Sequence, residues 1–189
     1  MPTLAKKILA RLDRLAGTEV EETLMYKITC GELLPQLKPA DGVDIEVLKP
    51  ESVYLLESVG RVGKEDVEQR LRRGDICYVA RTDGKIAHYS WVQHRGFHPI
   101  DPAGTGSDVA EGEFWIYNCR TVEWAKGRRI YPCTLSRILR DHMQQRFLKA
   151  IIYTTRSNMA SQKGILRAGF KQDCTLRAFR LGGRYFPLS

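Results

Sequence analysis

Four consecutive segments in the second half of the chain constrain its fold most, because strand and helix patterns alternate there. Residues 113–122 have a strand pattern, and a helix with one apolar face begins at Tyr131, where Pro132 suits the first turn. The run KAIIYTT at 149–155 is short, β-branched and aromatic, which is typical of a buried strand, and 158–168 predict another helix. This order favours a sheet with helices packed against it.

The first half adds further strands and a surface helix. Segments 21–30 and 43–56 have extended patterns, and 64–73 predict a surface helix. Residues 76–81 and 85–93 are strand-like and are joined through an Asp-Gly pair. Such a pair tolerates positive φ and therefore predicts a β-hairpin.

The remaining segments complete an α/β (α+β) chain, which we interpret as a single domain over 1–189. Residues 1–17 predict an N-terminal helix that suits a packing or homodimer contact better than a membrane surface. Residues 96–112 are rich in Gly, Pro and Asp, and predict a connection that is either a simple linker or a lid over a substrate. The runs 174–179 and 185–187 predict closing strands.

Composition narrows the classes of partner. The formal net charge of +8 favours anionic partners, which include nucleic acid, a membrane surface or a small phosphorylated ligand. No apolar run approaches the roughly 20 residues that cross a bilayer, and no signal-peptide pattern follows Lys6 and Lys7, so we expect a soluble cytoplasmic protein. The five cysteines are scattered without a Cys-x-x-Cys pair, which disfavours disulfides and a metal site.

The junction between the 113–122 strand and the following helix has the strongest chemical signal. It reads EWAKGRRIY over 123–131, so Lys126, Arg128 and Arg129 lie where a helix begins. Unpaired backbone N–H groups and the positive end of the helix dipole meet at such a place. The junction therefore suits a phosphate or diphosphate, and a solvated basic turn is the equally simple alternative.

The junction and the elements after it resemble the GNAT superfamily of N-acetyltransferases. The pyrophosphate loop of that family reads R/Q-x-x-G-x-G/A after a strand, and a later helix begins with Asn and ends in Gly-Phe. Here KGRRIY follows the first strand, and a helix led by Asn158 ends at Ala168-Gly169-Phe170. The resemblance covers 113–171, the implied acyl-CoA-binding core. The form KGRRIYP is similar to a subgroup found in bacterial cell-surface polysaccharide enzymes, which often reads R-G-x-G-I/L-Y-P.

The sequence departs from the family pattern in two respects. Arg129 and Tyr131 replace the two motif glycines, and Tyr131 restricts how closely a ligand approaches the backbone. The helix tyrosine that often protonates the departing CoA thiolate is replaced by Ile165.

The resemblance implies a twisted mixed sheet with helices on both faces, splayed to admit acyl-CoA. It places the pantetheine arm along a strand backbone, the pyrophosphate on the main-chain amides of the junction, and further contacts on the last helix, where Ser161 alternatively serves only packing. The implied acyl-CoA-binding residues are Cys119, Thr121, Lys126, Gly127, Arg129, Ile130, Tyr131, Asn158 and Ser161.

Three residues are candidates for proton transfer. Glu113 ranks first as general base, on the same strand face as Trp115, and its alternative is a solvent-facing charge. His88 ranks below it, since a lone strand histidine is more often structural. Tyr153 is a candidate acid in place of the missing tyrosine, or else a core residue.

The implied activity is acetyl transfer from acetyl-CoA to a primary amine by direct attack in a ternary complex. By analogy with the subgroup, the acceptor is an amino sugar or a small metabolite. The main alternative is a CoA-binding module without activity, because the family tyrosine and both motif glycines are absent. A basic nucleic-acid-binding protein ranks third, since the chain has no RNP, zinc or helix-turn-helix pattern.

Overall fold

The computed structural model describes residues 19–32, 34–59, 63–143 and 147–188. The helix predicted over 1–17 lies outside these residues. Within the described ranges, no helix combines the length and the apolar character that crossing a membrane requires.

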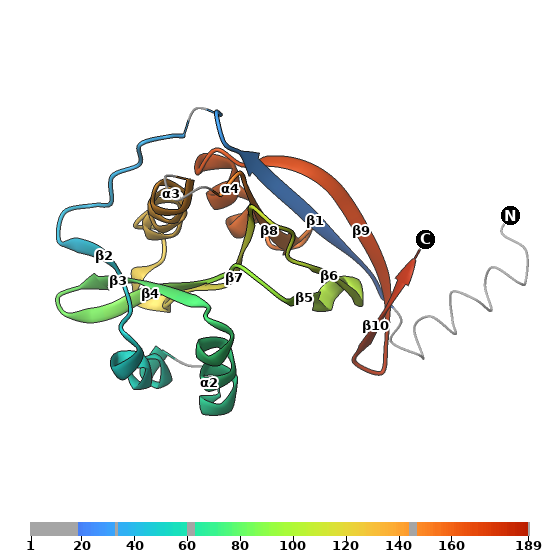
Figure 1. Ribbon diagram of the computed structural model, residues 1–189, viewed down its shortest axis with the longest axis horizontal. Helices are drawn as coiled ribbons and strands as arrows, with labels where there is room; N and C mark the ends of the chain where they lie inside the picture. The colour runs from blue at the N-terminus through green and yellow to red at the C-terminus, as the bar shows by residue number, and fades with distance from the viewer. Residues whose placement is uncertain (1–18, 33, 60–62, 144–146, 189) are drawn as a thin grey trace, which may run out of the picture.

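One mixed sheet forms the centre of the molecule (Figure 1), with strand order β10-β9-β1-β8-β7-β4-β3-β2. Its strands are β1 (Glu19–Thr29), β2 (Val43–Val47), β3 (Ile76–Thr82), β4 (Lys85–Gln93), β7 (Glu113–Thr121), β8 (Lys149–Thr155), β9 (Lys171–Leu181) and β10 (Arg184–Leu188). Neighbouring strands are antiparallel except β7 and β8, which run parallel and are connected through a helix. The prediction of a mixed α/β chain is confirmed.

Helices cover both faces of this sheet. Helices α3 (Ile130–Met143) and α4 (Met159–Arg167) lie on one face, and the 3-10 helix η1 (Pro50–Val59) and α2 (Lys64–Arg73) lie on the other, as Figure 1 shows. The short η3 (Glu123–Ala125) connects β7 to the turn before α3.

Alternating side chains of β7 supply separate cores on the two faces. Phe114 and Ile116 are fully buried in the cluster beneath α3 and α4. Trp115 points to the opposite face and packs with Met25 and Ile100. This alternation is the period of two that a strand imposes, and it fixes which side of β7 each later residue occupies.

One sequence-based prediction in the first half of the chain was wrong in part. The 43–56 segment is extended only over β2, and its second part forms η1. Val53, Leu56 and Val59 recur every three residues in η1 and pack into the cluster on the α2 face. That spacing matches a 3-10 helix, which has three residues per turn.

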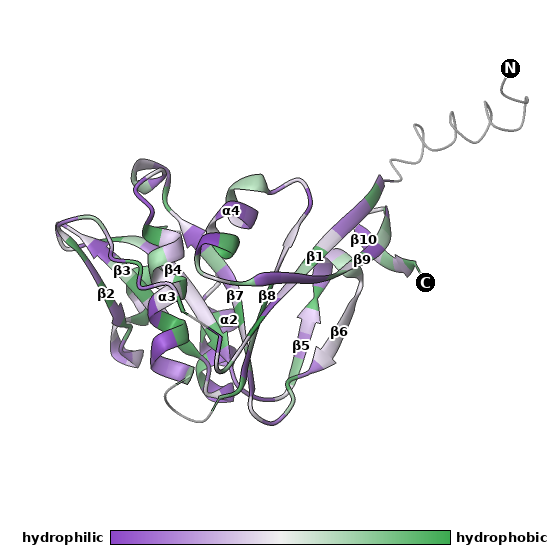
Figure 2. Ribbon diagram, turned by 90° about the horizontal axis from the view of Figure 1, so that it is seen from above, coloured by the Kyte–Doolittle hydropathy of each residue, from purple (hydrophilic) through white to green (hydrophobic). Residues whose placement is uncertain are grey.

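The 96–112 segment is not a plain connection. It folds into the two-stranded hairpin β5 (Phe97–Ile100) and β6 (Thr105–Asp108), linked by the short helix η2 (Asp101–Ala103). Ile100 and Ala103 are buried against β1 and β7, so a few apolar residues anchor a polar segment. Figure 2 shows this hairpin on the side of the molecule where β9 and β10 lie.

We expect the core beneath α3 to dominate stability. Leu139→Ala removes a side chain with no exposed surface and should lower the free energy of unfolding by about 2–5 kcal/mol, because lost burial and a residual cavity add. Leu166→Ala on α4 is the matched control, since Leu166 is 52% exposed, and it should change stability by less than about 1 kcal/mol. Urea denaturation measures both. Equal losses would contradict this assignment of the core.

Candidate functional site

The two parallel strands at the centre of the sheet separate partway along their length. Their pairing runs from Glu113 opposite Lys149 to Ile116 opposite Ile152, whereas β7 continues to Thr121 and β8 to Thr155. The sheet therefore opens between the second halves of β7 and β8. The splayed centre implied by the sequence resemblance is present.

A β-bulge in β7 accompanies this opening. Tyr89 of β4 pairs with Arg120 and Trp91 pairs with Tyr117, so β7 has one more residue than β4 between these pairs. Asn118 takes up the extra residue with φ of 45°, in the left-handed region. A bulge of this kind bends the strand that contains it, which here is the strand that parts from β8.

Two adjoining cavities occupy the opening. One, of about 520 Å³, lies between the start of α3 and the outer side of α4, and the other, of about 340 Å³, lies between β7 and β8. We call them the basic half and the sheet half of the cleft. Both are lined by Cys119, Tyr131, Asn158 and Ser161, so the two halves are continuous. The cleft reaches from the helix face of the sheet to η2 on the opposite face.

The turn before α3 is open toward the basic half. Gly127 has φ of 78°, and a Cβ placed on it would meet nothing within 4 Å. Arg129 has φ of 59°, in the left-handed region that glycine adopts more readily than other residues. The Lys126 amide already donates to the Glu123 carbonyl at 3.2 Å, and this residue therefore faces the cleft as a side chain and not as an amide donor.

Among the described residues, five cations and no carboxylate line the basic half. They are Arg120, Lys126, Arg129, Lys163 and Arg167, of which Lys126 forms an ion pair with Glu123 beside the cavity. The Nε atom of Arg120 is buried and has no hydrogen-bond partner within the described part of the chain. Sequence reasoning missed three of these cations, and the i, i+4 spacing of Lys163 and Arg167 on the Asn158-led helix was the available signal. The concentration of charge favours an anionic ligand.

Tyr131 stands where the two halves meet. Its hydroxyl lies 3.3 Å from the Ser161 hydroxyl, and its ring centroid lies 5.5 Å from that of His88. A Cβ on Gly164 would lie 2.5 Å from the Tyr131 ring, so only glycine lets α4 approach this side chain. Burial raises the pKa of Tyr131 and keeps its phenol protonated.

His88 lies inside the cleft as a neutral side chain. Its Nδ1 is 2.8 Å from the Thr121 hydroxyl and its Nε2 is 2.8 Å from the Ser90 hydroxyl. Burial lowers the pKa of His88 to about 3. Both ring nitrogens are therefore hydrogen-bonded. His88 fits a role in positioning Thr121 better than a role as general base.

Cys119 and Asn158 lie at the centre of the cleft. Burial raises the pKa of the Cys119 thiol to about 12, so it stays protonated and is not a nucleophile at neutral pH. The Asn158 Oδ1 accepts a hydrogen bond from the Ser161 amide at 3.1 Å and caps α4. Its amide NH2 is then the group left for a ligand.

The sheet half has a different lining. Tyr153 donates to the Pro99 carbonyl at 3.3 Å, and burial followed by the nearby charge of Asp101 raises its pKa. Tyr117 donates to the buried Asp75 carboxylate at 2.5 Å, and Asp75 also pairs with Arg73. These contacts fix two phenols as walls of the sheet half.

Glu113 lies away from both halves. It forms an ion pair with Lys149 at the paired end of β7 and β8, opposite the end where they separate. Cys119 lies six positions after Glu113, which corresponds to about 20 Å along a strand. The structure therefore does not bring this carboxylate to the cleft.

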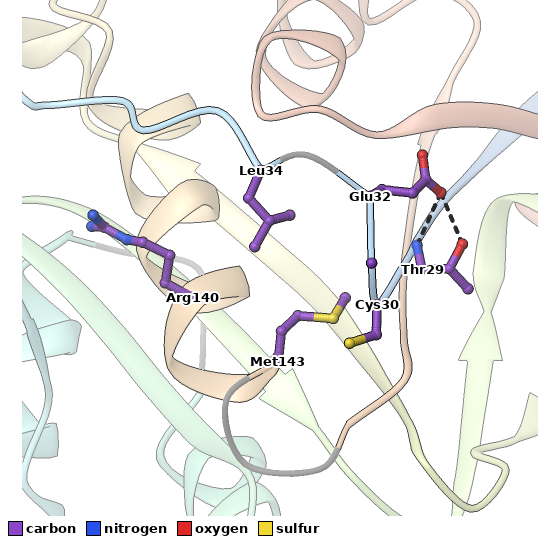
Figure 3. Close-up of a pocket in the computed structure, with 7 residues that line it drawn as sticks. Thr29, Cys30, Glu32, Leu34, Arg140 and Met143 are labelled. Carbon is purple, nitrogen blue, oxygen red and sulfur yellow. Dashed lines mark hydrogen bonds between the residues drawn. The ribbon is translucent and has the colours of Figure 1, made fainter.

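A smaller hollow of about 160 Å³ lies elsewhere, between the end of β1 and α3. Figure 3 shows Leu34, Cys30 and Met143 directed toward it, whereas the Arg140 guanidinium points away. Its lining is mainly apolar, and it shares no residue with the cleft. The described residues also contain no group of three His, Cys, Asp or Glu side chains arranged to hold a metal ion.

Comparison with known proteins identifies the fold. No family profile and no curated protein sequence matches this chain. A GCN5-related N-acetyltransferase from Sphaerobacter thermophilus superposes with a TM-score of 0.66 at 14% identity, over 92% of this chain and 55% of that protein. A GNAT-family acetyltransferase from Colwellia psychrerythraea gives 0.61 at 18% identity, over 98% and 62%. The chain thus spans little more than half the length of these neighbours, and it has the GNAT fold.

A third neighbour is the glucosamine N-acetyltransferase region of a fungal multi-domain β-N-acetylglucosaminidase. It gives a TM-score of 0.56 at 12% identity, over 93% of this chain and 23% of that protein.

We expect the burial of His88 to make the protein less stable in mild acid. The unfolded chain binds a proton near pH 6.5, whereas folded His88 does so only near pH 3, so stability present above pH 6.5 is lost as the pH falls. His88→Gln should reduce the slope of unfolding free energy between pH 5 and 6.5 by about 1 kcal/mol per pH unit. Urea denaturation at several pH values measures it.

Leu139→Ala serves as a control in the same experiment, since it destabilises the fold but keeps every histidine. It should retain the wild-type slope. A wild-type slope in His88→Gln would show that His88 is not held neutral in the folded protein.

Proposed function

We propose that this protein is an acetyl-CoA-dependent N-acetyltransferase that acts on a primary amine. The observation that carries the proposal is the cleft between the separated strands, with a helix N-terminus and five cations at one end. A diphosphate needs the cationic end, and an extended arm needs the strand edge that the separation exposes.

The residues of the basic half fit a CoA diphosphate. The open space at Gly127 allows a phosphate to approach the backbone, and the amides of Arg129, Ile130 and Tyr131 belong to the start of α3. Arg120 and Arg129 supply charge beside that turn, whereas the Lys126 ammonium is paired with Glu123. The cavity volume of about 520 Å³ lies in the range of ligand sites.

The edge of β7 beyond its pairing with β8 accounts for the rest of the ligand. Backbone groups from Cys119 to Thr121 can pair with an extended amide arm as an added strand would. Asn158 and Ser161 approach this arm from α4. A backbone N–H at the bulge near Cys119 is the donor that we assign to the developing oxyanion.

Acetyl-CoA supplies a thioester whose carbonyl carbon accepts the amine nitrogen. An N–C bond forms and the C–S bond breaks, the amine releases a proton to solvent, and the thiolate takes up one proton. Tyr131 and Tyr153 both line the cleft as protonated phenols, so either can supply that proton in place of the tyrosine absent at Ile165. Neither Glu113 nor His88 is assigned as the base.

An amino sugar or a small metabolite amine is the acceptor class that we propose. The KGRRIYP form and the likeness to the fungal glucosamine N-acetyltransferase region both support an amino sugar. The assignment to the cell-surface polysaccharide subgroup is part of the same proposal.

A CoA-binding module without activity is the second candidate. Arg129 and Tyr131 at the two glycine positions and the core residue Ile165 favour it. Incubation with acetyl-CoA and a panel of primary amines, followed by detection of free thiol, separates the two. We expect amine-dependent thiol release, and acetyl-CoA binding without release for any amine would favour the module.

We expect Gly127→Glu to weaken acetyl-CoA binding by about tenfold or more, because it places a carboxylate beside the diphosphate. Gly84→Glu is the matched control, since both glycines have φ near 75° and open space at the Cβ position, so the backbone strain is the same. Isothermal titration calorimetry measures both affinities. Equal affinities of the two folded variants would contradict the diphosphate site.

A further inference from the structure

The two halves of the cleft have opposite electrostatic character. Within the described ranges, the basic half is lined by five cations and no carboxylate. By the same measure, the sheet half is lined by one carboxylate, Asp101, and by no lysine or arginine. A donor with a diphosphate fits the basic half. The acceptor would then occupy the sheet half, where the carboxylate lies.

Asp101 is held in place by buried neighbours on both sides. Ile100 and Ala103 are buried in the cluster formed with Met25 and Trp115. Gly104 follows with φ of 60°, and a Cβ there would collide with the Tyr185 carbonyl, so η2 abuts β10 without room for adjustment. The exposed Asp101 side chain therefore stands on a rigid turn.

Asp101 lines two cavities. One is the sheet half, and the other is an outer cavity of about 460 Å³ formed with the β9–β10 turn. Arg184 also lines this outer cavity. An acceptor that entered through the outer cavity would pass Asp101.

We infer that Asp101 binds a cationic group of the acceptor and thereby determines acceptor specificity. The inference rests on the acetyl transfer proposed above and, of the two acceptor classes proposed there, favours small metabolite amines with a second cationic group over amino sugars with a single amine. Amines with a carboxylate or a phosphate near the reacting nitrogen are disfavoured by repulsion. Asp101 acts by binding, and the reacting nitrogen loses its own proton to water.

Three four-carbon amines of matched length test this inference. They are 1,4-diaminobutane, 4-aminobutan-1-ol and 4-aminobutanoate, which end in a cation, a neutral hydroxyl and an anion. We expect kcat/KM to fall in that order, with about tenfold or more between the first and the last. Asp101→Asn should reduce this ratio to about one, mainly through KM, and leave the affinity for acetyl-CoA unchanged.

Asp108→Asn is the matched control, because Asp108 is an exposed aspartate on the same hairpin that lines neither half of the cleft. It should keep the wild-type ranking. If turnover is too slow to rank the amines, calorimetric titration of each amine into the protein saturated with acetyl-CoA gives the same comparison as affinities.

The outcomes separate this inference from the proposed function. Failure of the wild-type protein to bind acetyl-CoA would overturn the proposed function itself. Binding of acetyl-CoA with equal ranking of the three amines, or an unchanged ratio in Asp101→Asn, would overturn only the role of Asp101. A preference for 4-aminobutanoate would also overturn it and would point to Arg184 as the recognising group.

Discussion

The cleft exists because the pairing between β7 and β8 stops partway along both strands. Four residues of β7 pair with four of β8, and the bulge at Asn118 then bends β7 away. A sheet whose central strands part exposes backbone donors and acceptors that need partners, because unpaired polar groups in a protein interior are costly. The exposed edge of β7 can thus pair with an extended polar ligand, and residues of β7, the turn before α3 and α4 supply the cationic end of the cleft.

The local structure accommodates Arg129 and Tyr131 at the two positions where the motif has glycine. Arg129 adopts the left-handed conformation that glycine takes without strain, at a cost of about 1–2 kcal/mol. The large ring of Tyr131 is accommodated because Gly164 has no side chain in the facing helix. The chain therefore keeps this turn while placing a phenol between the two halves of the cleft.

The two ends of the cleft carry opposite charge. Cations from β7, the turn and α4 converge at one end, and Asp101 lies at the other. In the proposed transfer, this arrangement would hold two substrates of opposite charge with their reactive groups at the strand separation, near Cys119. Holding both in one geometry would then be a large part of the catalysis.

The sequence by itself predicted the order of helices and strands from residue 64 onward, apart from the 96–112 hairpin, and it marked the 123–131 junction as a basic turn before a helix, because periodicity, turn residues and helix starts are local properties. Only the tertiary structure decided which side chains share the cleft. Arg120 and Arg167 meet there from a strand and a helix that are distant in sequence, and Glu113 does not, because a strand pattern does not reveal which end of a pair separates. The hairpin holding Asp101 was unpredictable for the same reason, since its anchors are buried only by contacts that folding creates.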